Sequence, residues 1–152
     1  MRLFMNTQST RQPLSFHLYK YLFLFLVGGF AYFYIEILFR GYSHFSMIIC
    51  GGLAFILCGA INQLMHFRIS LISQMILSTI IITGLEFVTG YIVNMRLHWN
   101  VWDYSKMPYN LHGQICVAYS AIWLILSLVC IFVDDLIRWK IFDEERARYY
   151  IW

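Results

Sequence analysis

Charged residues are scarce in this sequence, and their scarcity excludes most soluble folds. Only 12% of the 152 residues are Asp, Glu, Lys or Arg, whereas 61% are hydrophobic. Soluble domains carry roughly 25% charged and about 45–50% apolar residues. A soluble fold of this length cannot bury so much apolar surface. The composition therefore predicts an integral membrane protein, for which lipid is part of the solvent.

Other absences narrow the range of functions. The sequence has no long basic run and a net charge of only +3, so we expect no nucleic-acid partner. Its four cysteines lie in apolar segments without a CxxC pair, which favours packing over disulfides or metal binding. No Walker A, G-x-S-x-G or H-E-x-x-H motif is present, so the chain is not expected to hydrolyse ATP. We expect no cofactor.

Four apolar segments are each long enough for a membrane helix, which needs about 20 residues. They cover approximately residues 18–39, 46–65, 70–94 and 113–133 of a single membrane domain, 1–152. None shows the alternation of barrel strands. No small-residue cleavage pattern follows Gly29, so we expect the first segment to be retained. The predicted fold is an all-α, polytopic bundle of four transmembrane helices with an aromatic outer loop.

The distribution of basic residues predicts the orientation. One side of the membrane would hold eight of them, and the other side three. The eight are Arg2, Arg11, Lys20, Arg68, Arg138, Lys140, Arg146 and Arg148; the three are Arg40, Arg96 and Lys106. Both termini are therefore predicted to be cytoplasmic in the cell (plasma) membrane, with the loop 95–112 facing outward.

Polar residues gather at the outer end of this bundle. Glu36 and Arg40 are spaced as an i,i+4 ion pair, and Glu86 lies near the outer end of the third helix. An ionisable residue at membrane depth is a functional-site hypothesis by default. We predict a ligand-binding pocket formed by Glu86, Glu36, Arg40, Trp102, Asp103, Tyr104, Asn110, His112 and Gln114. The inner half of the bundle is expected to be nearly free of charge.

Two alternatives for these residues stay open. Glu86 could form an internal ion pair or hydrogen bond that fixes the helix register. His98, Asp103 and His112 could ligate zinc with Glu86 or perform acid–base chemistry, although their spacing matches no ligand pattern. We therefore predict no metal site.

The segment 136–152 mixes aromatic and charged residues. Glu144 is four residues from Arg148, and Asp143 is three from Arg146, as on a surface helix. We predict an amphipathic C-terminal helix in the headgroup layer, with a docking site for a soluble partner as the alternative.

An ordered set of residues over about 84–128 is similar to one known family. The set is Gly84-Leu85-Glu86, Thr89-Gly90, Val101-Trp102-Asp103-Tyr104-Ser105, Pro108, Asn110, Gly113-Gln114-Ile115-Cys116 and Ser120. It resembles the CmpB-type ABC-transporter permease family of small polytopic membrane proteins. The resemblance implies signature positions at Glu86, Trp102, Asp103, Tyr104, Pro108, Asn110 and Gly113.

Taken together, these features predict a small transport or ligand-binding membrane subunit. Because four helices enclose little space, we expect it to act as a homo-oligomer or with a partner membrane subunit, surrounded by membrane lipids. One alternative is a scaffold whose C-terminal tail recruits a partner. Another is an enzyme acting on lipid or glycan at the outer leaflet, which would use Glu86 with Asp103 or His112.

Overall fold

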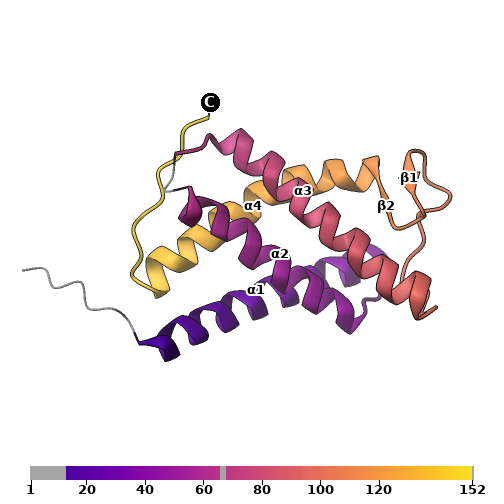
Figure 1. The fold of residues 1–152 in the computed structure, drawn as a ribbon, viewed down its shortest axis with the longest axis horizontal. Helices are drawn as coiled ribbons and strands as arrows, with labels where there is room; N and C mark the ends of the chain where they lie inside the picture. Colours follow the sequence, from indigo (N-terminus) through magenta and orange to yellow (C-terminus); the bar gives the residue numbers. More distant parts are fainter. Residues whose placement is uncertain (1–12, 66–67, 152) are drawn as a thin grey trace, which may run out of the picture.

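A computed structural model describes residues 13–65 and 68–151, and within them four long helices form the molecule (Figure 1). They are α1 (Leu14–Arg40), α2 (Phe45–Leu64), α3 (Leu71–Gly90) and α4 (Val117–Ile141). The π-helical turn η1 (Tyr91–Arg96) continues α3. All four are long and apolar enough to cross a membrane, which confirms the predicted all-α polytopic fold. Arg2, Arg11 and Trp152, which the sequence predictions include, lie outside the described residues.

The helices run up and down, so the molecule has two distinct ends (Figure 1). The loop end holds the α1–α2 connection and the segment between η1 and α4. The termini end holds the start of α1, the α2–α3 connection and the end of α4. Every residue of the predicted pocket belongs to the loop end.

Local signals set the helix boundaries. The side chain of His44 accepts a hydrogen bond from Ser46 N at the start of α2, and Ser70 accepts one from Ser73 N at the start of α3. The helix α1 ends at Gly41, whose φ of 78° is left-handed and whose N–H donates to Ile37 O. Glycine adopts this conformation without a steric penalty.

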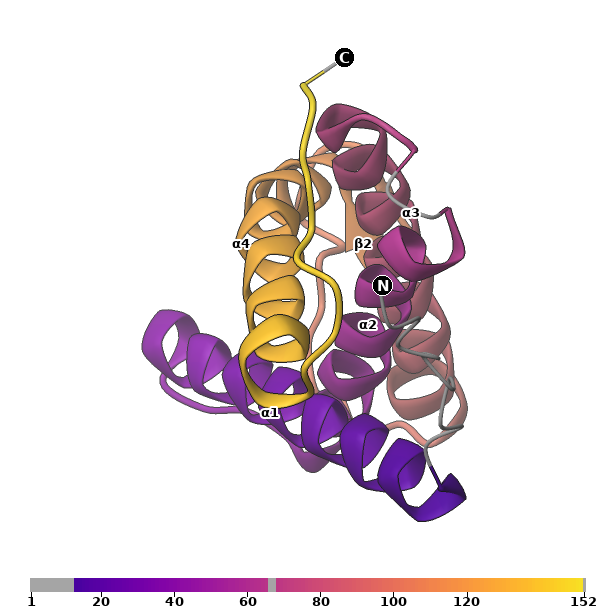
Figure 2. The ribbon, with the colours of Figure 1, turned by 90° about the vertical axis from the view of Figure 1, so that its left-hand side faces the viewer.

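Close backbone contact joins α1 to α2. A Cβ atom added to Gly28 would overlap the Cβ of Phe55, and one added to Gly51 would overlap the Cβ of Tyr32. Small residues permit such an approach between helices in lipid. The helix α2 is the most buried: 61% of its membrane window is buried, against 22% for α1 and α4. Figure 2 shows α1 crossing obliquely beside the other three helices.

The predicted fourth helix is displaced towards the C-terminus. It was expected over 113–133 but begins at Val117, because Gly113 has a φ of 68° and the preceding residues form a small antiparallel hairpin. In this hairpin β1 (Asn110–Leu111) pairs with β2 (Ile115–Cys116). At its other end α4 continues eight residues beyond the predicted limit, to Ile141.

The predicted C-terminal amphipathic helix over 136–152 is wrong. Residues up to Ile141 extend α4, and 143–151 are not helical. Glu144 does not pair with Arg148 but turns back to Lys20 and Arg138, at 2.5 and 3.6 Å. Phe142 is buried and its ring packs against three aromatic rings of α1, those of Phe16, Tyr19 and Phe23. Contacts with the bundle therefore replace helix formation in the tail.

Candidate functional site

Glu86 is buried near the end of α3, with 2% of its surface exposed. Its Oε2 accepts a hydrogen bond of 2.9 Å from Nε1 of Trp123 on α4. Its Oε1 accepts one of 3.2 Å from the hydroxyl of Tyr104 in the loop. Both donors are neutral, so the carboxylate is hydrogen-bonded without being paired to a cation. Trp123 lies within an apolar segment. Its role as a hydrogen-bond donor to Glu86 was missed, because nothing in the sequence distinguishes it from a tryptophan that only packs against its neighbours or lies at the membrane surface.

Glu36 has a different environment although it is also buried. Its Oε1 lies 2.7 Å from Nη1 of Arg40, which confirms the predicted i,i+4 pair. Its Oε2 accepts a hydrogen bond of 2.5 Å from the hydroxyl of Ser43. Arg40 also donates from Nη2 to Val101 O at 2.6 Å. The pair therefore ties the end of α1 to the loop that covers Glu86.

Asn94 of η1 holds the same loop from the opposite side. Its Nδ2 donates to Trp102 O at 3.0 Å and to Gln114 Oε1 at 2.9 Å. Its Oδ1 accepts from Val101 N at 2.7 Å. The indole Nε1 of Trp102 donates to Gln114 O at 2.9 Å. Asn94 was not among the predicted pocket residues, but its position four and eight residues after Gly90 and Glu86 was a usable signal.

Aromatic stacking completes the surroundings of Glu86. The ring of Tyr104 stacks on that of Tyr119 with centroids 4.5 Å apart, and Tyr32 stacks on Trp123 at 5.2 Å. Burial, together with the nearby Glu86 carboxylate, holds the pKa of Tyr104 far above its usual value. Its hydroxyl therefore stays protonated and remains a hydrogen-bond donor.

Asp103, Asn110 and His112 shape the loop and do not contact Glu86. Asp103 is exposed and accepts hydrogen bonds from Ser105 N and Oγ, at 2.8 and 2.9 Å, which lower its pKa. Asn110 donates to Met107 O at 2.8 Å and accepts from Gly113 N at 2.9 Å. The exposed His112 has a φ of 52°, and its carbonyl accepts from Gln114. Within the described ranges, no three His, Cys, Asp or Glu side chains group as metal ligands.

An apolar cavity of about 160 Å³ lies among α1, α2 and α4. Its lining includes Gly28, Tyr32, Phe55, Trp123 and Cys130. Trp123 thus contacts both the cavity and Glu86. Glu86 itself is not among the residues that line the cavity.

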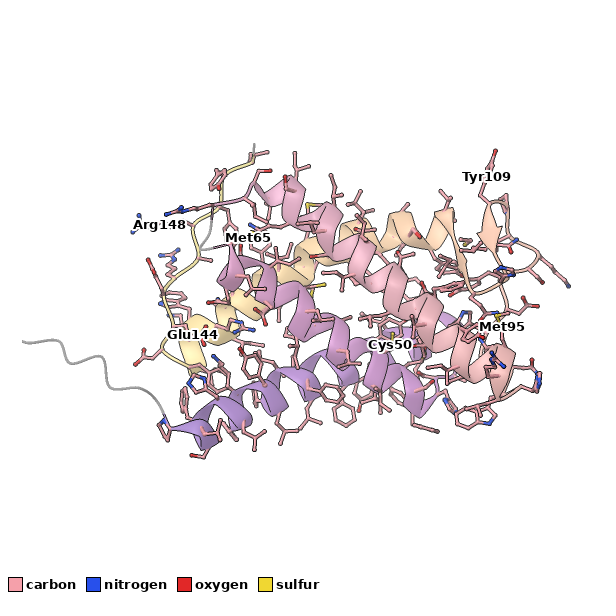
Figure 3. The ribbon with its side chains drawn as sticks, in the orientation of Figure 1. Cys50, Met65, Met95, Tyr109, Glu144 and Arg148 are labelled. Carbon is pink, nitrogen blue, oxygen red and sulfur yellow. The ribbon has the colours of Figure 1, made fainter. Side chains whose placement is uncertain are left out.

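The termini end holds a second polar cluster, which corrects the expectation that this half is nearly free of charge. Asp134 and Arg138 of α4 are 0% and 1% exposed and pair at 2.6 Å. Figure 3 shows Glu144 at this end, opposite Met95 and Tyr109 at the loop end. The fourth segment was predicted to end at residue 133, just before Asp134, although the i,i+4 spacing of Asp134 and Arg138 repeats that of Glu36 and Arg40.

Comparison with known proteins identifies a family. A family model described as "Putative ABC-transporter type IV" matches residues 20–149. The match extends the resemblance noted over 84–128 to all four helices. No match is found among curated proteins or solved structures. The family and the four apolar helices together make this a multi-pass, membrane transport-related protein. Because the match covers most of the sequence, the chain belongs to the "Putative ABC-transporter type IV" family, which contains the CmpB-type proteins.

Proposed function

We propose that this protein is the ligand-binding membrane subunit of a transport system, and that Glu86 is the binding carboxylate. The proposal rests on one observation: Glu86 is 2% exposed and its hydrogen-bond donors, Trp123 and Tyr104, are both neutral. An ionised carboxylate at this depth is costly unless a positive charge compensates it. A proton or the cationic group of a ligand would supply that charge.

A purely structural role explains Glu86 less well. A carboxylate that fixes helix register through an ion pair has a cation beside it, as Glu36 has Arg40, whereas Glu86 has only its two neutral donors. The two arginines of the loop end both have other partners. Arg40 contacts Glu36 and Val101 O, and Arg96 donates to the hydroxyl of Tyr91 at 2.8 Å. The environment of Glu86 therefore favours the reversible binding of a proton or a cationic group.

The loop supplies a route to this carboxylate. Tyr104 is a loop residue, so its withdrawal would remove one of the two hydrogen bonds to Glu86. We propose that the loop faces outward, that ligand enters by displacing Tyr104, and that Trp102 and Gln114 hold the rest of the loop in place. A second copy or a partner membrane subunit would complete the path, in the cell membrane with both termini cytoplasmic.

The functional test compares metabolites in cells and medium for strains that produce wild type, Glu86→Gln or no protein. We expect Glu86→Gln to resemble the strain without protein, while the protein keeps its membrane level and oligomer size. The matched control is Glu145→Gln, which removes an exposed carboxylate at the other end and should resemble wild type. Loss or aggregation of the Glu86→Gln protein would show that the carboxylate is structural, and a wild-type metabolite profile would refute its role in binding.

A chemical test addresses the same carboxyl directly. N,N′-dicyclohexylcarbodiimide reacts with protonated carboxyl groups at membrane depth, and mass spectrometry locates the adduct. We expect an adduct at Glu86 and none at Glu36, because Glu36 is paired with the guanidinium of Arg40 whereas the donors to Glu86 are neutral. Tyr104→Phe, which removes one donor, should speed the reaction. Equal labelling of the two glutamates would contradict the distinction on which the proposal depends.

A further inference from the structure

Buried oxygen atoms without partners gather at the termini end, far along the bundle from Glu86. Asp134, Asn62 and Ser78 are 0%, 3% and 0% exposed. Within the described part of the chain, Asp134 Oδ1, Asn62 Oδ1 and Ser78 Oγ have no hydrogen-bond partner, and neither has Oε1 of the buried Gln74. Buried polar atoms in proteins are almost always satisfied. Four unsatisfied acceptors therefore point to a ligand that the helices share.

Contacts between the helices bring Asp134 and Ser78 into one region. A Cβ atom on Gly59 of α2 would overlap Oδ2 of Asp134, so the glycine makes room for the carboxylate of α4. The neighbouring Cys58 has its Sγ 3.9 Å from the carbonyl oxygen of Ser78 on α3. The helices α2, α3 and α4 thus meet around Asp134.

Asn62 lies one turn further along α2 and faces the next residue of α4. Its Nδ2 donates to Oδ2 of Asp135 at 2.5 Å, which leaves its Oδ1 as the unsatisfied atom. The hydroxyl of Tyr149 donates to the same carboxylate oxygen at 2.7 Å. On α3, Gln74 is 1% exposed and donates from Nε2 to Ile69 O, which leaves its Oε1 free.

The charges of this cluster do not balance. Three carboxylates, those of Asp134, Asp135 and Glu144, face two cations, Arg138 and Lys20, and one negative charge is left over. Lys20 lies 2.5 Å from Glu144, while Arg138 contacts Asp134 at 2.6 Å and Glu144 at 3.6 Å.

Two other basic groups at this end form no ion pair with these carboxylates in the described part of the chain. Lys140 and Arg146 lie over the ring of Trp139, at 3.7 and 5.0 Å from its centroid. Arg138 has an unpartnered Nη2 of its own, and its guanidinium lies 5.9 Å from the ring centroid of Tyr21. Because the charge of Arg138 is already counted as one of the two cations, its unpartnered nitrogen adds no further positive charge to the cluster.

We propose that a monovalent cation of the size of Na⁺ binds between α2, α3 and α4, held by oxygen atoms of Asp134, Asn62, Ser78 and Gln74. Hard cations are bound by carboxylate, amide and hydroxyl oxygens. One positive charge balances the cluster, and the four unsatisfied acceptors come from the three helices that meet around Asp134. A proton on Asp134 would balance the charge but would leave most of these acceptors unsatisfied. The site is separate from Glu86 and does not depend on the function proposed for it.

The test uses the full-length protein in lipid nanodiscs, with NaCl replaced stepwise by choline chloride at constant ionic strength. A cation that binds only the folded state raises the unfolding temperature, and above its Kd the increase grows with the logarithm of the cation concentration. We expect Na⁺ to do so for wild type and for the control Glu145→Gln. Asp134→Asn should abolish the Na⁺ response. Ser78→Ala, which removes a single buried hydroxyl, should weaken the apparent Na⁺ affinity about tenfold.

Three results would overturn the proposal. One is an equal unfolding temperature of wild type in NaCl and in choline chloride. Another is stabilisation by lower pH alone with no response to Na⁺, which would assign the missing charge to a proton. The third is a wild-type Na⁺ response in Ser78→Ala, a variant that decides the question even if Asp134→Asn does not fold.

Discussion

Two buried glutamates at the loop end show how a partner determines the role of a carboxylate. Glu36 accepts from a guanidinium and a hydroxyl, whereas Glu86 accepts from an indole and a phenol. The sequence identified both glutamates as candidate site residues and predicted the Glu36–Arg40 pair, because ionisable residues are conspicuous in apolar segments. It could not predict Trp123 as a donor, since an indole is equally suited to packing and hydrogen bonding.

This difference predicts opposite effects of two isosteric substitutions. Glu36→Gln leaves the partly buried Arg40 without its counter-charge and should lower the free energy of unfolding by about 2 kcal/mol, between the values for exposed and buried pairs. Glu86→Gln keeps an oxygen for Trp123 and removes an uncompensated charge, so stability should be unchanged or higher. Thermal unfolding in nanodiscs measures both, and greater destabilisation by Glu86→Gln would contradict the comparison.

At the scale of elements, apolar runs predicted the four helices but not all of their ends. The fourth segment was predicted to end at residue 133, before Asp134, whereas Asp134 and Arg138 pair inside α4, which continues to Ile141. The sequence predicted an aromatic loop before the fourth helix, and in the structure Asp103 of this loop accepts a hydrogen bond from Ser105 N. The link from Asn94 to this loop depends on tertiary contacts that no local pattern contains.

The Asn94 contacts make the loop dependent on a single side chain. Asn94→Ala removes hydrogen bonds to Val101 N, Trp102 O and Gln114 Oε1. At roughly 1 kcal/mol for each bond, we expect a loss of about 2–4 kcal/mol and faster amide exchange in 97–116. Hydrogen-exchange mass spectrometry measures the loop directly. The control Asn100→Gly, at an exposed position with a φ of 50°, should leave exchange unchanged. Unchanged exchange in Asn94→Ala would show that other contacts hold the loop.

The tail depends on Glu144 in a comparable way. Glu144→Gln removes the ion pairs to Lys20 and Arg138, so the tail should detach more often, and trypsin should bind the backbone at the exposed Arg146 and Arg148 more readily. We expect cleavage several times faster than in wild type, measured by intact-protein mass spectrometry. Glu145→Gln, at an exposed neighbour, should be cleaved at the wild-type rate. Identical rates in the two variants would mean that other contacts, such as those of Phe142 and Tyr149, fix the tail.

At the scale of the whole molecule, the distribution of exposed groups agrees with a bilayer environment. Large apolar side chains are exposed along the helices, for example Leu22, Leu53, Ile80 and Ile125. In water such a surface would cause aggregation, whereas lipid tails cover it. The buried polar clusters lie at the two ends, with Glu86 in one and Asp134 in the other. The orientation of these ends decides which cluster meets the outside of the cell.

The count of basic residues predicts that the loop end faces outward. Lys106 is exposed in the loop, and Glu145 is exposed in the tail at the termini end. The native cysteines are buried or half-buried, so single new cysteines can be labelled against a low background. A membrane-impermeant maleimide applied to intact cells should therefore label Lys106→Cys but not Glu145→Cys, which should react only after permeabilisation. The reverse pattern would place Glu86 at the cytoplasmic side and Asp134 outside, so that a ligand from the exterior would meet the Asp134 cluster first.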